Sequence, residues 1–157
     1  MGLDMYLYKK TYLSTGDFIK EEFREEITLT KGGKPHPKIK KENVKYVVEE
    51  VGYWRKANHI HKWFVDNVQE GDDDCAEYEV SRDQLMSLLK TCNEVVDDYR
   101  DTGGTKAHEL LPTSTGFFFG DTSYDQHYFG TIFETIEIIE DLLEEDIDGN
   151  LYYESSW

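Results

Sequence analysis

Cysteine, proline and long hydrophobic runs are scarce in this sequence, and each shortage excludes a class of protein. The 157 residues include 2 cysteines and 3 prolines, too few for a disulfide framework or a proline-rich chain. No window approaches the roughly 18 uninterrupted apolar residues of a transmembrane helix. The opening segment MGLDMYLYKKTYL lacks the basic start and apolar run of a secretory signal peptide. We therefore expect a soluble protein of a reducing cytoplasm, without membrane contact.

Basic residues are also scarce, and they disappear from the last third of the chain. Lys and Arg number 17 against 33 Asp and Glu, which gives a formal net charge of −16. Residues 1–56 carry +3, residues 57–106 carry −7, and residues 107–157 carry −12 with no Lys or Arg. A protein that binds nucleic acid through its phosphates needs basic residues to face them. We therefore expect no direct nucleic-acid binding, but either a solvated acidic surface or a partner protein with a basic surface.

Aromatic residues, in contrast, are plentiful. They make up 14% of the chain, and 11 of them are tyrosines. This content argues against disorder, and the length suits one domain with one core. No repeat or linker divides the sequence. We expect residues 1–157 to form a single α+β domain, with a mostly antiparallel sheet and about three packed helices.

Hydrophobic periodicity predicts the elements of this domain. Short apolar or alternating segments predict strands at residues 4–13, 25–30, 44–54, 76–80, 116–120 and 151–157, with a bulge at Gly52. Apolar residues at helical spacing predict helices from Trp54 until Gly71, from Ser81 until Gly103, and from about Tyr124 to Glu145. Ser81 and Gln84 form a capping-box pattern at the start of the second helix.

The segment YWRKANHIHKWF, residues 53–64, holds the greatest density of side chains that could bind a ligand. On a helix, Arg55, His59 and Lys62 would share one polar face that could hold a phosphate or a carboxylate, or that could simply be solvated. His61 falls on the apolar face, where we expect a core histidine. Aromatic side chains nearby could stack on a base. The candidate ligand site comprises Arg55, Asn58, His59, Lys62, Trp63, Asp121 and Tyr124.

The last predicted helix combines many carboxylates with no basic residue. Five of its acidic residues could lie along one side of the helix, spaced roughly like the phosphates of a nucleic acid. These candidate partner-binding residues are Glu134, Glu137, Glu140, Asp141 and Glu144. Such a surface would attract a basic protein, with fast association that weakens in salt.

Catalytic motifs are missing. No nucleophile elbow, phosphate-binding loop or dinucleotide fingerprint is present, and Cys75 and Cys92 lack partners at metal-ligand spacing. A metal-assisted enzyme that uses residues 72–74, Asp121 or Asp125 with His59 remains an alternative. We expect a binding protein rather than an enzyme, with no cofactor, no metal site and no catalytic residue.

Four segments of the chain carry a resemblance to a known group of proteins. They are MGLDMYLYKK, WRKANHIHKWFVDNVQ, LPTSTGFFFGDTSYD and YYESSW. Together these segments resemble a family of small proteins encoded by bacteriophages and prophages. The resemblance implies a phage accessory protein that acts in the bacterial cytoplasm during infection; it implies no activity, cofactor or catalytic residue.

Phage accessory proteins commonly block or redirect host machinery, and the acidic charge suggests how this one would do so. We expect its acidic surface, mimicking nucleic acid, to occupy a basic surface of a host protein, for example of a defence system. The first alternative is the capture of a nucleotide or other small anion in a pocket around Arg55 and His59. The second is the metal-assisted enzyme. The Tyr- and Trp-rich composition is also compatible with a homodimer.

Overall fold

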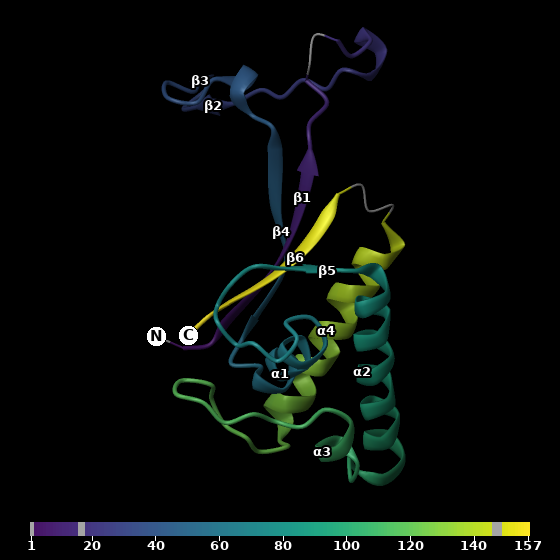
Figure 1. Cartoon of the computed structure of the whole chain (residues 1–157). Coiled ribbons are helices and arrows are strands. Elements are labelled where there is room, and N and C mark those ends of the chain that lie inside the picture. Colours follow the sequence, from purple (N-terminus) through teal and green to yellow (C-terminus); the bar gives the residue numbers. More distant parts are fainter. Residues whose placement is uncertain (1, 16–17, 146–148) are drawn as a thin grey trace.

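A four-stranded antiparallel sheet with helices packed against it forms the body of the protein (Figure 1). The computed structural model describes residues 2–15, 18–145 and 149–157. The strands are β1 (Asp4–Tyr12), β4 (Tyr46–Arg55), β5 (Tyr78–Val80) and β6 (Asn150–Ser156), in the spatial order β4-β1-β6-β5. The first and last strands therefore pair at the centre of the sheet. The expected α+β class with a mostly antiparallel sheet is confirmed.

The central strand β1 alternates between the core and the opposite face of the sheet, as the period of a strand requires. Leu3, Met5 and Leu7 are fully buried, whereas Tyr6 and Tyr8 lie on the other face and stack with ring centroids 5.7 Å apart. The pairing of β1 with β4 contains the expected irregularity beside Gly52: Leu7 pairs with Gly52 and Tyr8 with Glu50. A Cβ at Gly52 would lie 3.1 Å from Ile138, so glycine allows α4 to approach the sheet closely.

The main helices are α1 (Asn58–Asn67), α2 (Arg82–Thr102) and α4 (Gln126–Glu144), with a short α3 (Ala107–Leu110). Ser81 caps α2 in the predicted capping box with Gln84. Asp125 caps α4 by accepting hydrogen bonds from the backbone of His127 and Tyr128. Among the described residues, no helix has both the length and the apolar character that crossing a membrane requires.

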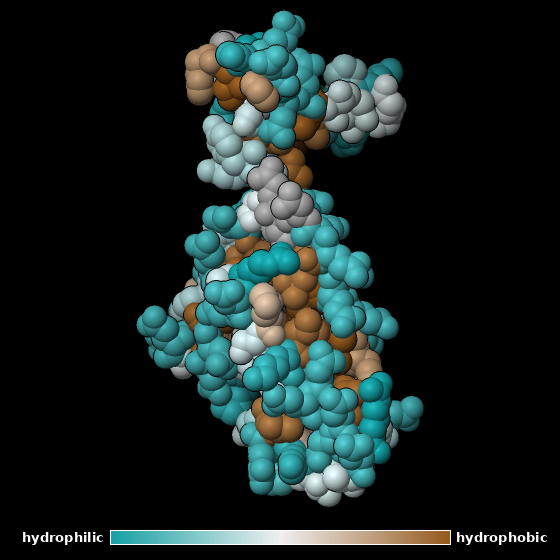
Figure 2. All heavy atoms as spheres, turned by 90° about the vertical axis from the view of Figure 1, so that its right-hand side faces the viewer, coloured by the Kyte–Doolittle hydropathy of each residue, from teal (hydrophilic) through white to brown (hydrophobic). Residues whose placement is uncertain are grey.

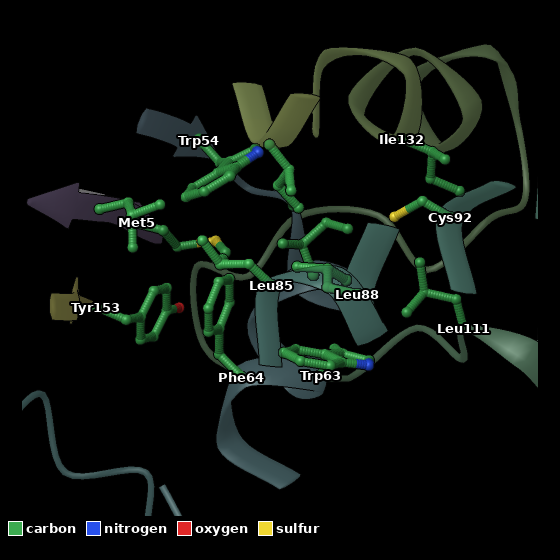
Figure 3. Close-up of a cluster of buried hydrophobic side chains, with 14 of the residues drawn as sticks. Met5, Trp54, Trp63, Phe64, Leu85, Leu88, Cys92, Leu111, Ile132 and Tyr153 are labelled. Atoms are coloured by element: carbon green, nitrogen blue, oxygen red, sulfur yellow. The ribbon is translucent and has the colours of Figure 1, made fainter. Parts of the chain in front are cut away.

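One hydrophobic core joins the helices to the sheet (Figure 3). Trp54 and Phe64 contact each other at 6.0 Å between ring centroids, and Phe64 stacks on Tyr153 of β6 at 3.9 Å. The indole of Trp54 also donates a hydrogen bond of 2.9 Å to Thr135 of α4. Cys92 is buried in this core, which raises the pKa of its thiol to about 12 and leaves it unreactive.

An arm extends from one end of the sheet (Figure 1). β1 pairs with β6 only as far as Lys10 but with β4 as far as Tyr12, and residues 13–15 and 18–45 lie at the far end of this ribbon. The arm contains two one-turn 3₁₀ helices, Glu21–Phe23 and Lys41–Asn43, and the hairpin of β2 (Thr30–Lys31) with β3 (Lys34–Pro35). Apart from Leu13, no described residue of the arm is buried.

Two predicted strands are wrong. Residues 25–30 alternate like a strand, but only Thr30 pairs with another strand, because the arm offers that segment no sheet to join. Residues 116–120 form a tight turn instead of a buried strand, and only Phe119 of its three phenylalanines reaches the core. The apolar residues of this segment therefore form a loop that exposes two of the phenylalanines.

Candidate interaction surface

Helix α4 exposes the predicted acidic residues on one side. Its other side packs on the sheet and on α2, and burial there follows the helical period through Phe129, Ile132, Thr135, Ile139 and Leu142. The side facing away from this stripe carries Glu134, Glu137, Glu140, Asp141 and Glu144, all of them exposed. Figure 2 views the molecule from the side of α2 and α4 and shows mainly hydrophilic residues, interrupted by hydrophobic ones. We call these five carboxylates, together with Phe133 among them, the acidic face.

The carboxylates of the acidic face lack ion-pair partners in the described part of the chain. None of its five carboxylates forms an ion pair with another described residue. From Glu134 to Glu144 the helix rises about 15 Å, so each carboxylate occupies about 3.8 Å of the axis. One strand of a DNA duplex carries a phosphate about every 3.4 Å. The acidic face therefore has nearly the linear charge density of a single DNA strand.

An exposed aromatic ring lies within this acidic face. Phe133 precedes Glu137 by one helical turn, and 40% of its surface is exposed. Arg82 at the start of α2 donates a 2.7 Å hydrogen bond to the carbonyl of Leu143, which fixes the end of α4 beside α2. The acidic face is thus a rigid helix surface that combines negative charge with an apolar contact.

The predicted helix face with Arg55, His59 and Lys62 does not exist. Arg55 belongs to β4, because the chain turns at Lys56 before α1 begins, and it is exposed 4.0 Å from Asp4. Lys62 forms an ion pair with Asp66 at 2.6 Å, one turn further along α1. Trp63 is buried in the core and cannot stack on a base. These three members of the candidate ligand site therefore do not converge on one surface.

Three other members, Asn58, His59 and Asp121, do come together at the start of α1, with Tyr124 nearby. Asn58 is buried and donates hydrogen bonds to the carbonyls of Phe119, at 3.2 Å, and Asp121, at 2.8 Å. Its side-chain oxygen accepts a 3.0 Å hydrogen bond from the backbone of Ser114. One side chain thus holds both ends of the loop between α3 and α4 against α1.

We expect Asn58→Ala to lower the free energy of unfolding by about 3 kcal/mol, because it leaves three backbone groups without their partner. Urea denaturation measures this change. Asn93→Ala, an exposed change on α2, is the matched control and should cost less than about 0.5 kcal/mol. A similar small loss for Asn58→Ala would show that Asn58 does not hold the loop.

His59 is buried rather than exposed. Its Nε2 lies 2.9 Å from the hydroxyl of Thr131, which itself donates to the carbonyl of Tyr128 at 2.9 Å. Burial, with His127 nearby, lowers the pKa of His59 to about 3. The cavity beside it measures about 10 Å³, room for a single water molecule. This part of the candidate ligand site is therefore a packed junction that is too small for a nucleotide.

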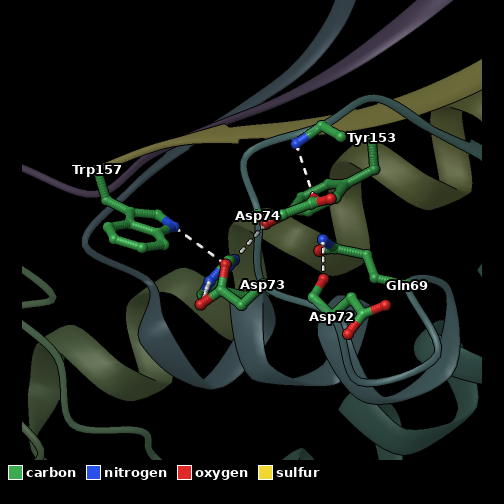
Figure 4. Close-up of polar contacts among 8 residues, drawn as sticks. Gln69, Asp72, Asp73, Asp74, Tyr153 and Trp157 are labelled. Atoms are coloured by element: carbon green, nitrogen blue, oxygen red, sulfur yellow. Dashed lines mark hydrogen bonds and ion pairs between the residues drawn. The ribbon is translucent and has the colours of Figure 1, made fainter.

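His61 is the buried histidine that the sequence predicted. Asp73 lies 3.1 Å from its Nε2, and the hydroxyl of Tyr153 lies 2.7 Å from its Nδ1. Since a carboxylate only accepts, Nε2 is the donor to Asp73, and in the neutral imidazole Nδ1 accepts from the hydroxyl of Tyr153. Trp157 also donates to Asp73, at 3.0 Å (Figure 4). This network ties the end of the chain to α1.

The acidic loop after α1 is also occupied by internal contacts. Asp73 binds Trp157 (Figure 4) and His61, while Asp74 accepts hydrogen bonds from the backbone of Ala76 and from the hydroxyl of Tyr78. The Asp121 carboxylate accepts from the hydroxyl and the backbone of Ser123, which lowers its pKa. Across the described parts of the chain, no three His, Cys, Asp or Glu side chains are grouped so that they could hold a metal ion.

A group of exposed aromatic and basic residues, which the sequence analysis missed, lies near both termini. It comprises Tyr53, Arg55, Lys56, Phe117, Phe118 and Trp157, and we call it the aromatic end. All four segments that carry the resemblance contribute to it or to its surroundings, since Arg55 and Lys56 come from the second of them. The backbone of Leu3 donates a 3.2 Å hydrogen bond to the carbonyl of Phe118, and the rings of Phe119 and Trp157 lie 5.9 Å apart between centroids. The sequence signal that indicated a turn here was the pair of glycines, Gly116 and Gly120, that flank the three phenylalanines.

The backbone of the aromatic end is strained. Phe118 has a φ of 72°, and Lys56 has a φ of 56°. For residues with a Cβ, the left-handed region costs about 1 kcal/mol or more. Such strain at an exposed position persists only where surrounding contacts impose it, and it is often found at functional sites.

Comparisons with protein-family models, with curated proteins and with solved structures found no match to this chain.

Proposed function

We propose that the protein is a non-enzymatic binding protein whose acidic face occupies the basic, nucleic-acid-binding surface of another protein. The observation that carries the proposal is the row of five exposed carboxylates on α4, none of them paired with a described residue. Following the resemblance to phage proteins, the partner would be a bacterial host protein, and the effect would be to block or redirect the host system to which it belongs.

The electrostatics support a basic partner. Residues 107–157 contain no Lys or Arg, so the charged side chains of the acidic face are all carboxylates. A charge row of nearly the density of a DNA strand can occupy several phosphate-binding side chains at once. Phe133 adds an apolar contact that screening by salt does not weaken. The acidic face thus offers both the steering charge and a short-range anchor.

The two alternatives have less support in the geometry. A nucleotide pocket around Arg55 and His59 would need these side chains to converge, but Arg55 is exposed on β4 and His59 faces a cavity of about 10 Å³. A metal-assisted enzyme would need a group of ligating side chains, and the carboxylates of Asp73, Asp74 and Asp121 are instead bound by side chains and backbone of the chain itself.

Capture from a bacterial lysate at low salt tests the proposal. The immobilised protein should retain a basic, nucleic-acid-binding protein at ~50 mM salt and release most of it at ~500 mM, because screening weakens the contact. Added duplex DNA should displace the chain from this partner. A retained protein that binds the chain and DNA simultaneously would contradict occupation of the nucleic-acid surface.

A further inference from the structure

We propose that the aromatic end is a self-association surface, through which two copies of this chain form a symmetric dimer. Phe117 is 82% exposed, Trp157 49% and Tyr53 42%. Exposed side chains of these types beside Arg55 match the residues that dominate the centres of protein interfaces. The proposed binding of a basic partner by the acidic face neither uses this surface nor depends on it.

The aromatic end is pre-organised for such a contact. Three hydrogen bonds hold its phenylalanine turn: the backbone of Leu3 donates to the carbonyl of Phe118, and the side chain of Asn58 donates to the carbonyls of Phe119 and Asp121. Phe119 is buried against His61 at 5.2 Å between ring centroids, so the turn cannot rotate Phe117 inward without losing a core residue. A rigid aromatic side chain loses little conformational freedom when a partner covers it.

The charges of this region identify a second copy as the occupant. Two chains of net charge −16 repel each other wherever their acidic surfaces meet. At the aromatic end, Arg55 lies 4.0 Å from Asp4, and Trp157 donates a hydrogen bond to Asp73, so a cation and carboxylates are both present. A two-fold interface brings the same patch together on both copies, and a patch with both signs can complement itself. A nucleic acid would meet these carboxylates and the negative field of the chain.

A dimer formed at the aromatic end would leave both acidic faces available. The termini and the phenylalanine turn lie on one side of the molecule, and α2 and α4 lie on the other (Figure 1). The dimer would therefore present two acidic faces, and a partner with two basic surfaces would bind it with increased avidity.

Sedimentation equilibrium of the purified chain tests the proposal. At ~150 mM salt the chain should show a monomer–dimer equilibrium, and Phe117→Ser should raise the dissociation constant at least about 10-fold. Phe18→Ser on the arm, where Phe18 is 91% exposed, is the matched control and should leave the equilibrium unchanged. Arg55→Glu is a second variant that should also weaken the dimer, because it removes the cation that complements the partner's carboxylates.

Salt should affect the two surfaces in opposite directions. Self-association should tighten between ~50 and ~500 mM salt, because screening reduces the repulsion between two acidic chains. A species of 18.4 kDa at every concentration would overturn the proposal, as would a Phe117→Ser chain that dimerises like the wild type. A monomeric chain that still binds a basic partner would contradict the dimer alone and leave the proposed function standing.

Discussion

Replacing Glu137 and Glu144 by lysine is expected to weaken binding of a basic partner about 100-fold at ~50 mM salt. Each replacement removes one attraction and adds one repulsion, and a contact between unit charges near water is worth about 1 kcal/mol. The two replacements together make four such changes, two lost attractions and two added repulsions. After screening by salt these amount to roughly 3 kcal/mol of binding free energy, which corresponds to the 100-fold loss. Because both side chains are exposed, the fold should not change. Titration calorimetry with the captured partner measures the dissociation constant.

A matched control separates the position of the charge from its amount. Glu21→Lys with Glu22→Lys makes the same change in net charge on the arm, where both side chains are exposed. This control should weaken binding less than about 5-fold, through the reduced long-range field only. Equal losses for the two double variants would show that net charge, and not the acidic face, governs association.

Acidification is expected to destabilise the protein through His59. In the unfolded chain this histidine gains a proton near its ordinary pKa of 6.5, whereas the folded protein resists protonation down to a pKa of about 3. Stability is therefore complete above pH 6.5 and falls as the pH drops from 6.5 towards 3. At pH 4 the loss should be on the order of 3 kcal/mol, because each pKa unit corresponds to about 1.4 kcal/mol.

His59→Gln isolates this effect from the many carboxylates of the chain. Glutamine keeps a polar group near Thr131 but does not titrate. The difference in unfolding free energy between wild type and variant should shrink by about 3 kcal/mol from pH 7 to pH 4. Urea denaturation at several pH values measures it. Parallel stability curves for the two proteins would show that His59 takes up a proton in the folded state.

Local signals predicted most of the fold. The capping box of Ser81 and Gln84 and the helical spacing of residues such as Ile132 and Ile139 depend only on neighbours in sequence, and these predictions are confirmed. The central pairing of β1 with β6 joins residues almost 150 positions apart. No local pattern encodes that distance, so the strand order could not be predicted.

The predicted ligand site was wrong for a related reason. Its helical face required Arg55 to belong to α1, but the helix begins at Asn58, after Lys56 adopts a left-handed conformation. His59 then points at Thr131, 72 positions further along the chain, and becomes buried. The helix begins four residues later than predicted, which leaves Arg55 on β4, and of the predicted face only His59 is buried.

The acidic residues of α4 were predicted to be exposed because charge and helical period agree there. Carboxylates without partners avoid the interior, so Glu134, Glu137 and Glu144 could lie only on the outer side. The aromatic end was missed because residues 116–120 look like a buried strand by composition. The left-handed backbone of Phe118, which turns the rings outward, is a property of the folded loop.

Native mass spectrometry of the protein purified from a bacterial expression culture at low salt tests the central claim most directly. We predict a complex of the chain with a basic bacterial protein, which disappears when Glu137 and Glu144 are replaced by lysine. A bound mass of nucleotide size, or a chain without any bound protein at ~50 mM salt, would contradict the proposal that the acidic face binds a basic partner.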